Sequence, residues 1–107
     1  MTPRIDALAT YNARYVAWID AAEATVAADT ARRELRQQIT ESLIGQPNPM
    51  TSKPHSATSA EAAAELTPDY RDAAATCALT TRAERLALME RECAKYALEL
   101  GIAGVDP

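Results

Sequence analysis

The sequence contains no phenylalanine and only three glycines, two cysteines and one histidine among its 107 residues. It also lacks any hydrophobic run approaching the roughly 18 to 20 residues that a transmembrane helix needs. The first residues, MTPRIDALATYN, contain no apolar segment of the secretory type. We therefore expect a soluble, cytoplasmic protein that does not enter a membrane.

The scarcity of histidine and cysteine argues against catalysis and metal binding. His55 and Ser56 are adjacent, but neighbouring side chains rarely point at one another, and no third residue is placed to orient them. Cys77 and Cys93 would lie about 24 Å apart along one helix, which is too far for a disulfide. We interpret both as small core residues in a reducing compartment. The sequence predicts a non-enzymatic protein without catalytic residues, cofactor or metal.

Alanine is abundant, whereas Leu, Ile and Val together account for only 17 residues. Alanine is the best helix former, but burying it removes little apolar surface from water. A short chain with few large aliphatic residues therefore has a thin core. This composition predicts a single helical domain that would be stabilised by association with a second chain.

Proline and glycine set the boundaries of two long helices. Thr2 and Pro3 suit a helix start, and no other Pro or Gly occurs before Gly45. Thr67 and Pro68 repeat the start signal, and the next glycine follows residue 100. The predicted order is a helix over about 3–44, a proline-rich loop over 45–57, a short helix over about 59–66, a helix over about 68–100 and a frayed tail over 101–107. Thr58 with Glu61 has capping-box spacing for the short helix, and Ser56 and Ser59 are competing caps.

Two long helices joined by a compact connection predict an all-α antiparallel hairpin with coiled-coil-like packing. We expect Leu43 to lie near Tyr70, which would place Trp18 beside Tyr96. A seam with alternating three- and four-residue spacing is formed by Leu86, Met89, Cys93, Tyr96 and Leu100. Because a lone hairpin leaves much apolar surface exposed, we expect two copies to form a four-helix bundle.

Most of the aromatic residues gather toward the end of the hairpin away from the loop. They cannot all face one seam, so some of them are available to a second copy or to another protein. The candidate self-association or partner face comprises Tyr11, Tyr15, Trp18, Met89 and Tyr96. The predicted function is therefore protein–protein interaction or self-association, with a homodimer as the expected assembly.

Nucleic-acid binding is the alternative function. Arginines cluster late in the first helix, and the start of the short helix offers backbone N–H groups that favour anions. The candidate phosphate contacts are Arg32, Arg33, Arg36, Lys53, His55, Ser56 and Ser59. The serines are also what a helix cap requires, and a net charge of −4 lacks the footprint of a strong DNA binder.

The segment IGQPNPMTSKPHSATSAE, residues 44–61, followed by TPDY, resembles a loop in small helical proteins of tailed bacteriophages and prophages. In that family an Ala-, Glu- and Arg-rich helix leads into an IGxPNPxTxKPHSATSAE segment, and a second helix follows. Ser52 stands where the family's turn carries glycine. The resemblance implies a phage or prophage origin and an accessory role near DNA replication or recombination in the bacterial host. It implies no catalytic residue.

Overall fold

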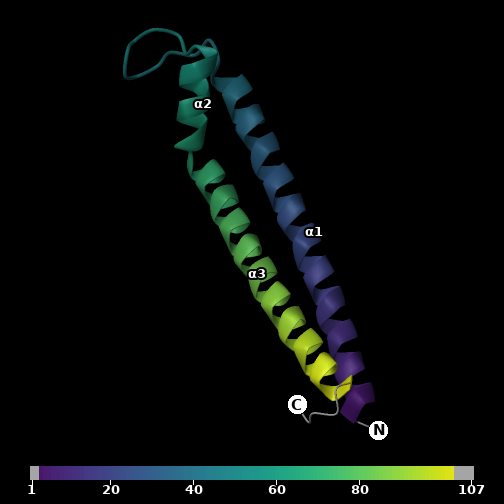
Figure 1. The fold of residues 1–107 in the computed structure, drawn as a ribbon. Coiled ribbons are helices and arrows are strands. Elements are labelled where there is room, and N and C mark those ends of the chain that lie inside the picture. Colours follow the sequence, from purple (N-terminus) through teal and green to yellow (C-terminus); the bar gives the residue numbers. More distant parts are fainter. Residues whose placement is uncertain (1–2, 103–107) are drawn as a thin grey trace. The chain divides into compact units, whose positions relative to one another are not determined.

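The computed structural model describes residues 3–102, which are helical apart from a loop over residues 44–56 and a two-residue turn at Leu66 and Thr67 (Figure 1). Two long helices, α1 (Pro3–Leu43) and α3 (Pro68–Ile102), are separated in the chain by the short helix α2 (Ala57–Glu65). No strand occurs within this part of the chain. The prediction of two long helices with a short one between them is confirmed. None of these helices combines the length and the apolar character needed to cross a bilayer.

The helix boundaries differ from the expected ones by at most two residues. α2 begins at Ala57 rather than near residue 59, because Ser56 is the cap that is used. α3 continues through Gly101 to Ile102, past its expected end at about residue 100. Helix ends commonly vary by one or two residues. The expected cap at Thr2 and the remainder of the expected tail lie outside the described residues.

Two of the expected boundary signals are seen directly. The Thr67 hydroxyl donates to the Ala64 carbonyl oxygen at 2.7 Å and accepts the Tyr70 N–H at 3.3 Å, so one side chain joins the end of α2 to the start of α3. Gly45, just beyond α1, has a φ of 85°, a backbone conformation that glycine adopts without strain. Both residues therefore serve the roles that the sequence predicts.

The described residues form two compact units, and α1 and α3 contribute to both. The first unit contains residues up to Thr25 and from Leu79 onward, and the second is Val26–Ala78.

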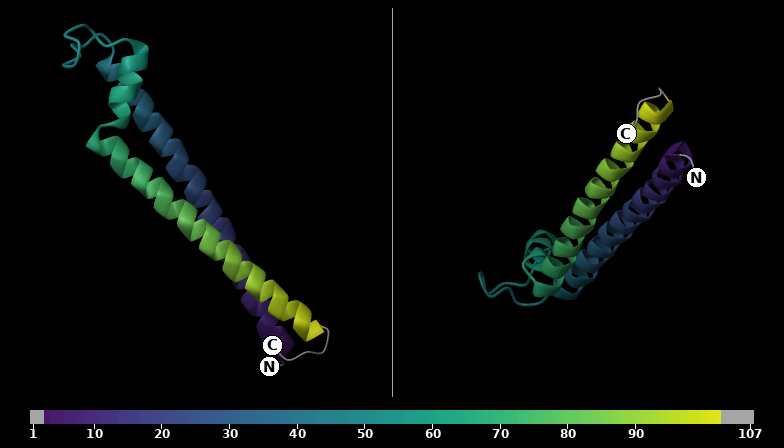
Figure 2. Two further views of the ribbon diagram at one scale, coloured as in Figure 1. Left: turned by 60° about the vertical axis from the view of Figure 1, so that its left-hand side comes forward. Right: turned by 90° about the horizontal axis from the view of Figure 1, so that it is seen from below.

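In the first unit the start of α1 lies beside the end of α3 (Figures 1 and 2). Arg14 Nη1 lies 3.1 Å from Glu90 Oε2, and the Thr25 hydroxyl donates to the Thr80 carbonyl oxygen at 3.1 Å. The partner's residue number falls as the α1 number rises, so the two segments run antiparallel. Many half-buried residues of this unit are small, which allows the helices to approach closely; they include Ala7, Ala21, Ala22, Ala87, Ala94 and Ala97.

The expected register of this unit is wrong. Trp18 lies against Arg91, about five residues along α3 from its expected neighbour Tyr96. Tyr96 and Cys93 are both exposed, so the interpretation of Cys93 as a core residue is also wrong. The reason is that small residues and an arginine fill the seam, which leaves the bulkier side chains of α3 on another face.

The second unit holds the fully buried apolar side chains found among the described residues, Ala60 and Ala64. They are four residues apart on α2 and therefore share one face of that helix. His55, directly before the cap of α2, is the buried polar residue of this unit, with only 8% of its surface exposed. The core of this unit is thus small and lies under α2.

Salt bridges and a hydrogen bond show which helices meet in the second unit. Arg36 Nε lies 3.0 Å from Glu65 Oε1, so α2 lies beside the last turns of α1. The Arg32 guanidinium donates to the Tyr70 hydroxyl at 2.8 Å. We had expected Tyr70 near Leu43, which is a further eleven residues along α1. The expectation fails because α2, not α3, is the first helix to pack on α1 after the loop.

The loop between α1 and α2 folds back on itself as a short ribbon. The Gly45 N–H donates to the His55 carbonyl oxygen at 3.2 Å, and the Asn48 N–H donates to the Lys53 carbonyl oxygen at 2.7 Å. Near its tip Ser52 has a φ of 59°, which is the left-handed region. Ser52 therefore adopts a backbone conformation that glycine favours.

We predict that Ser52→Gly stabilises the protein. A left-handed conformation costs a residue with a Cβ roughly 1–2 kcal/mol, and the added freedom of glycine in the unfolded chain offsets part of this gain. The expected net increase in the free energy of unfolding is about 0.5–1 kcal/mol, measured by urea unfolding. Ser42→Gly, within α1, is the control and should lower the stability by a similar amount. Equal losses in both variants would contradict the prediction.

Candidate functional site

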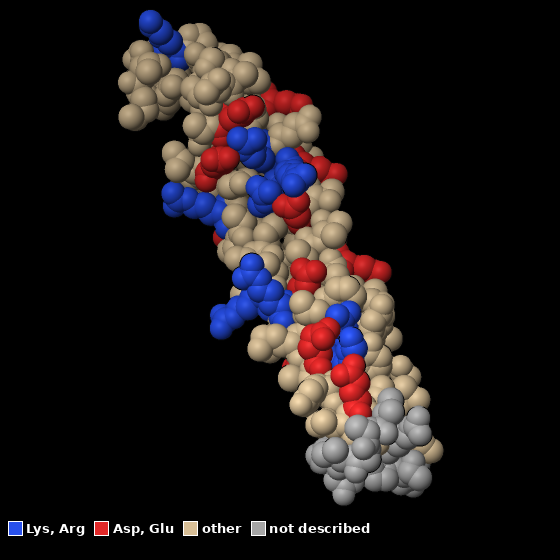
Figure 3. Space-filling view, viewed as in Figure 1, with Lys and Arg blue, Asp and Glu red and all other residues tan. Residues whose placement is uncertain are grey.

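The three arginines proposed as phosphate contacts are paired with carboxylates in the second unit. Arg32 Nη2 and Arg33 Nε lie 2.8 Å and 3.0 Å from the two oxygens of Asp29. Arg36 is held by Glu65, as described above. Figure 3 shows basic and acidic side chains interspersed on the visible face rather than gathered into a patch of one sign. The arrangement neutralises the local basic charge.

The pairing also changes the acid–base properties of this cluster. The hydrogen bond from Arg32 holds the pKa of Asp29 below its ordinary value of 3.8 and outweighs the opposing effect of desolvation. The bonds to Asp29 and to the Tyr70 hydroxyl raise the pKa of Arg32 further above its ordinary range. Both partners are therefore charged at neutral pH.

The lowered pKa of Asp29 predicts a pH-dependent contribution to stability. The contribution is present above the unfolded-state pKa near 3.8 and is lost as the pH falls through the lower folded-state value. We expect Asp29→Asn to lower the urea midpoint at about pH 7 and to match wild type at about pH 2. Asp20→Asn, at an exposed position of α1, serves as the control. An unchanged difference between Asp29→Asn and wild type at both pH values would contradict the prediction.

Three of the residues proposed as anion contacts, His55, Ser56 and Ser59, are brought together at the start of α2, where they bond one another. His55 Nδ1 lies 3.0 Å from Ser59 Oγ, and the Ser59 N–H donates to Ser56 Oγ at 3.2 Å. Ser56 is thereby the N-cap of α2. Lys53 is exposed in the ribbon, apart from this cluster. The geometry assigns the serines and the histidine to capping and packing.

We expect labelled single- and double-stranded DNA to show no saturable rise in fluorescence anisotropy with this protein at low salt. The candidate arginines are neutralised by Asp29, Glu61 and Glu65, and binding to phosphate would have to break these pairs. Saturable binding that weakens with added salt and with Lys53→Ala would instead support the nucleic-acid hypothesis. Arg71→Ala, at an exposed position outside the arginine cluster, is the matched control.

Three residues of the proposed partner face form an aromatic cluster inside the first unit. The rings of Tyr11 and Tyr15 are 6.0 Å apart, and those of Tyr15 and Trp18 are 5.9 Å apart. The Arg91 guanidinium carbon lies 5.4 Å from the Tyr15 ring centre and 4.5 Å from that of Trp18. Arg91 also donates to Glu92 and thereby lowers the pKa of that carboxyl. Tyr15 and Trp18 thus connect α1 to α3 through Arg91.

Sequence reasoning missed Arg91 as a residue of the seam. The available signal was its spacing, since Arg91 follows Glu84 by seven residues and lies between Ala87 and Ala94 on one side of α3. The row of large apolar residues is the stronger periodic signal in this part of the sequence. A planar guanidinium with an aliphatic stem is nevertheless well suited to stack on aromatic rings.

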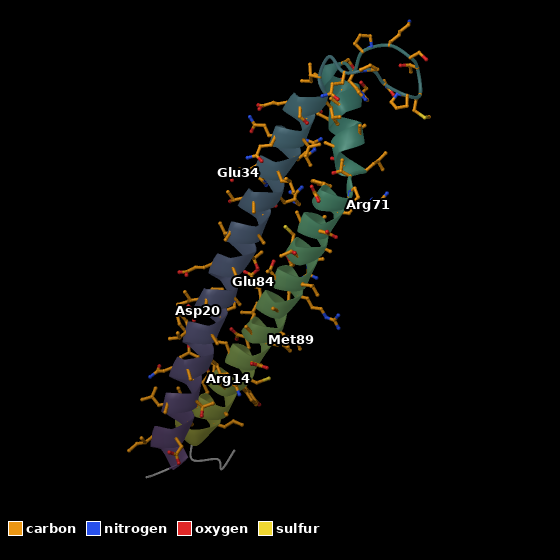
Figure 4. The ribbon with its side chains drawn as sticks, turned by 180° about the vertical axis from the view of Figure 1, so that it is seen from behind. Arg14, Asp20, Glu34, Arg71, Glu84 and Met89 are labelled. Carbon is orange, nitrogen blue, oxygen red and sulfur yellow. The ribbon has the colours of Figure 1, made fainter. Side chains whose placement is uncertain are left out.

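Met89 and Tyr96 lie apart from the aromatic cluster, on an exposed side of α3. Their exposed fractions are 64% and 63%. A helix turns about 100° per residue, so both side chains point away from the face on which Arg91 meets α1. In Figure 4 Met89 lies on the side of α3 away from α1, whereas Glu84 lies on the side toward it.

The exposed row to which these residues belong is named the outer stripe, and it comprises Leu79, Leu86, Met89, Cys93 and Tyr96. From Leu86 to Tyr96 its members follow the three- and four-residue steps of a heptad seam, and Leu79 lies one heptad before Leu86. Four of them are the bulk of the coiled-coil seam predicted from the sequence, but the structure places them outside the contact with α1. The sequence therefore predicts the spacing of this row correctly, but its prediction that the row faces α1 is wrong.

The outer stripe is the most distinctive feature of the first unit. None of the described residues of this unit is fully buried, and α1 exposes large apolar side chains as well: Ile5, Leu8, Tyr15, Val16 and Ile19. Apolar groups recurring at heptad spacing on a solvent-exposed helix face are typical of a helix that packs on another helix. The first unit therefore presents an apolar surface that could contact another helix.

Within residues 3–102 no three His, Cys, Asp or Glu side chains lie close enough together to hold a metal ion. Comparison with protein families, curated proteins and solved structures gives no match to this chain. The likeness to phage and prophage proteins therefore stays a hypothesis that rests on residues 43–70.

Proposed function

We propose that this chain is a non-enzymatic accessory protein of a tailed phage or prophage, which acts in the bacterial cytoplasm through self-association of its helices. The single observation that carries the proposal is the outer stripe. Large apolar side chains are displayed at heptad spacing, while the fully buried apolar side chains among the described residues are two alanines. The phage origin is supported by the loop sequence alone.

Energetic considerations favour a dimer that depends on concentration. Leu79, Leu86, Met89 and Tyr96 from two copies supply eight large side chains, and each gives about 1.5–3 kcal/mol when fully buried. Burial of the still exposed part would then supply on the order of 10 kcal/mol, which lies within the estimated cost of association, about 4–15 kcal/mol. Area alone therefore does not make this dimer permanent. We expect association to rise with protein concentration.

We predict that wild-type protein sediments above its monomer mass of 11.5 kDa as concentration increases, and that Met89→Ser weakens this association. Removal of one apolar anchor from each copy should raise the dissociation constant about tenfold or more. Met50→Ser is the matched control, because Met50 is 90% exposed in the loop and lies outside the outer stripe. Sedimentation equilibrium measures all three proteins.

Two results would contradict the proposal. One is a wild-type protein that stays monomeric over the whole concentration range. The other is an association that Met89→Ser and Met50→Ser affect equally, since self-association would then use another surface or none in particular. Circular dichroism should show unchanged helix content in both variants, because both side chains are exposed in the single chain.

A further inference from the structure

We infer that the outer stripes of two copies pair antiparallel, with Leu86 of each copy against Met89 of the other. The inference rests on the proposed self-association and adds the partner element, its direction and its register.

The heptad positions of α3 limit the ways in which two stripes can meet. Leu79, Leu86 and Cys93 recur every seven residues and form one row of the seam. The second row recurs with the same period and consists of Arg82, Met89 and Tyr96. Arg82 is exposed and is the charged member within this otherwise apolar seam. The position of Arg82 therefore distinguishes a parallel pairing of two stripes from an antiparallel one.

A parallel pairing is disfavoured by Arg82. In a parallel pair each seam residue lies beside its own copy, so two guanidinium groups would meet within the seam. Placing like charges against each other at an interface costs several kcal/mol. An antiparallel pair avoids this contact, because residues of one row then lie against residues of the other row.

One antiparallel register matches all six seam positions. When the two-fold axis passes between Leu86 and Met89, those residues lie against each other across the axis. Leu79 then lies against Tyr96 of the second copy, and Arg82 lies against Cys93 of the second copy. Every large apolar member of the outer stripe therefore gains an apolar neighbour, and the same contacts occur twice by symmetry.

The charges beside the seam favour the same arrangement. Arg85 and Glu92 lie seven residues apart on one flank of the outer stripe, and both are exposed. In the antiparallel register Arg85 lies opposite Glu92 of the second copy, whose carboxylate also accepts a hydrogen bond from Arg91 of its own chain, and symmetry repeats the pair. Such rim pairs add little affinity, but opposite charges at these positions specify orientation. The outer stripe is thus complementary to the outer stripe of a second copy.

A single new cysteine tests the register. In a Cys77→Ala background, Arg82→Cys places a thiol where Cys93 of the second copy is expected. The two cysteines of one chain are eleven residues apart, about 16 Å along the helix, so they cannot join within that chain. Under mild oxidation we expect a covalent dimer on a non-reducing gel, formed at least about tenfold faster than in the controls because pairing raises the effective thiol concentration.

Two controls separate specific pairing from chance collision. The Cys77→Ala background alone keeps Cys93 and should form little dimer, since the two Cys93 residues lie far from each other in the proposed register. Lys95→Cys in the same background puts a thiol at an exposed position off the stripe and should behave likewise. Rapid dimer formation through Cys93 alone would indicate a parallel pair and overturn the inference.

Sedimentation in reductant distinguishes failure of the inference from failure of the proposed function. If Arg82→Cys associates in reductant but forms no covalent dimer on oxidation, the register is wrong and self-association stands. If wild-type protein and this variant are both monomeric, self-association and the pairing fail together. Loss of association in Arg82→Cys alone would also overturn the inference, because removal of a charge from the apolar seam should not weaken it.

Discussion

The packing of Arg91 against Tyr15 and Trp18 determines which side of α3 meets α1 in the first unit. A cation placed over two aromatic rings contributes about 0.5–2 kcal/mol, and the aliphatic stem of the arginine adds contact area. Once this face is turned inward, Ala87 and Ala94 follow it into the seam, because they recur on the same side of the helix. The large apolar residues must then point outward.

This arrangement leaves large apolar side chains of α1 and α3 exposed in the single chain. A helix pair held by alanines, threonines and one stacked arginine buries little apolar area, so its own packing stabilises it weakly. The second unit has only slightly more buried apolar surface, from Ala60 and Ala64 of α2. The proposed association would serve two purposes, because a contact that joins two chains through the outer stripe would also remove exposed apolar groups from water.

In the second unit, salt bridges and local hydrogen bonds engage most of the residues proposed to contact phosphate. Asp29 lies three and four residues from its arginine partners, so that pairing could be read from helical spacing. The contact of Arg36 with Glu65 could not, since it depends on α2 packing beside α1. The cluster of His55, Ser56 and Ser59 was likewise visible in the sequence, but only its geometry shows that these groups bond one another.

The sequence by itself determined where the helices begin and end, because caps, prolines and a left-handed glycine act over a few neighbouring residues. It also determined which residues share a face, since that follows from the helical period. Only the tertiary structure decided which face points inward. Periodicity groups Leu86 with Met89 and Ala87 with Ala94 without saying which group meets α1. That choice depends on residues distant in sequence, Tyr15 and Trp18 on α1 and Arg91 on α3, which pack against one another.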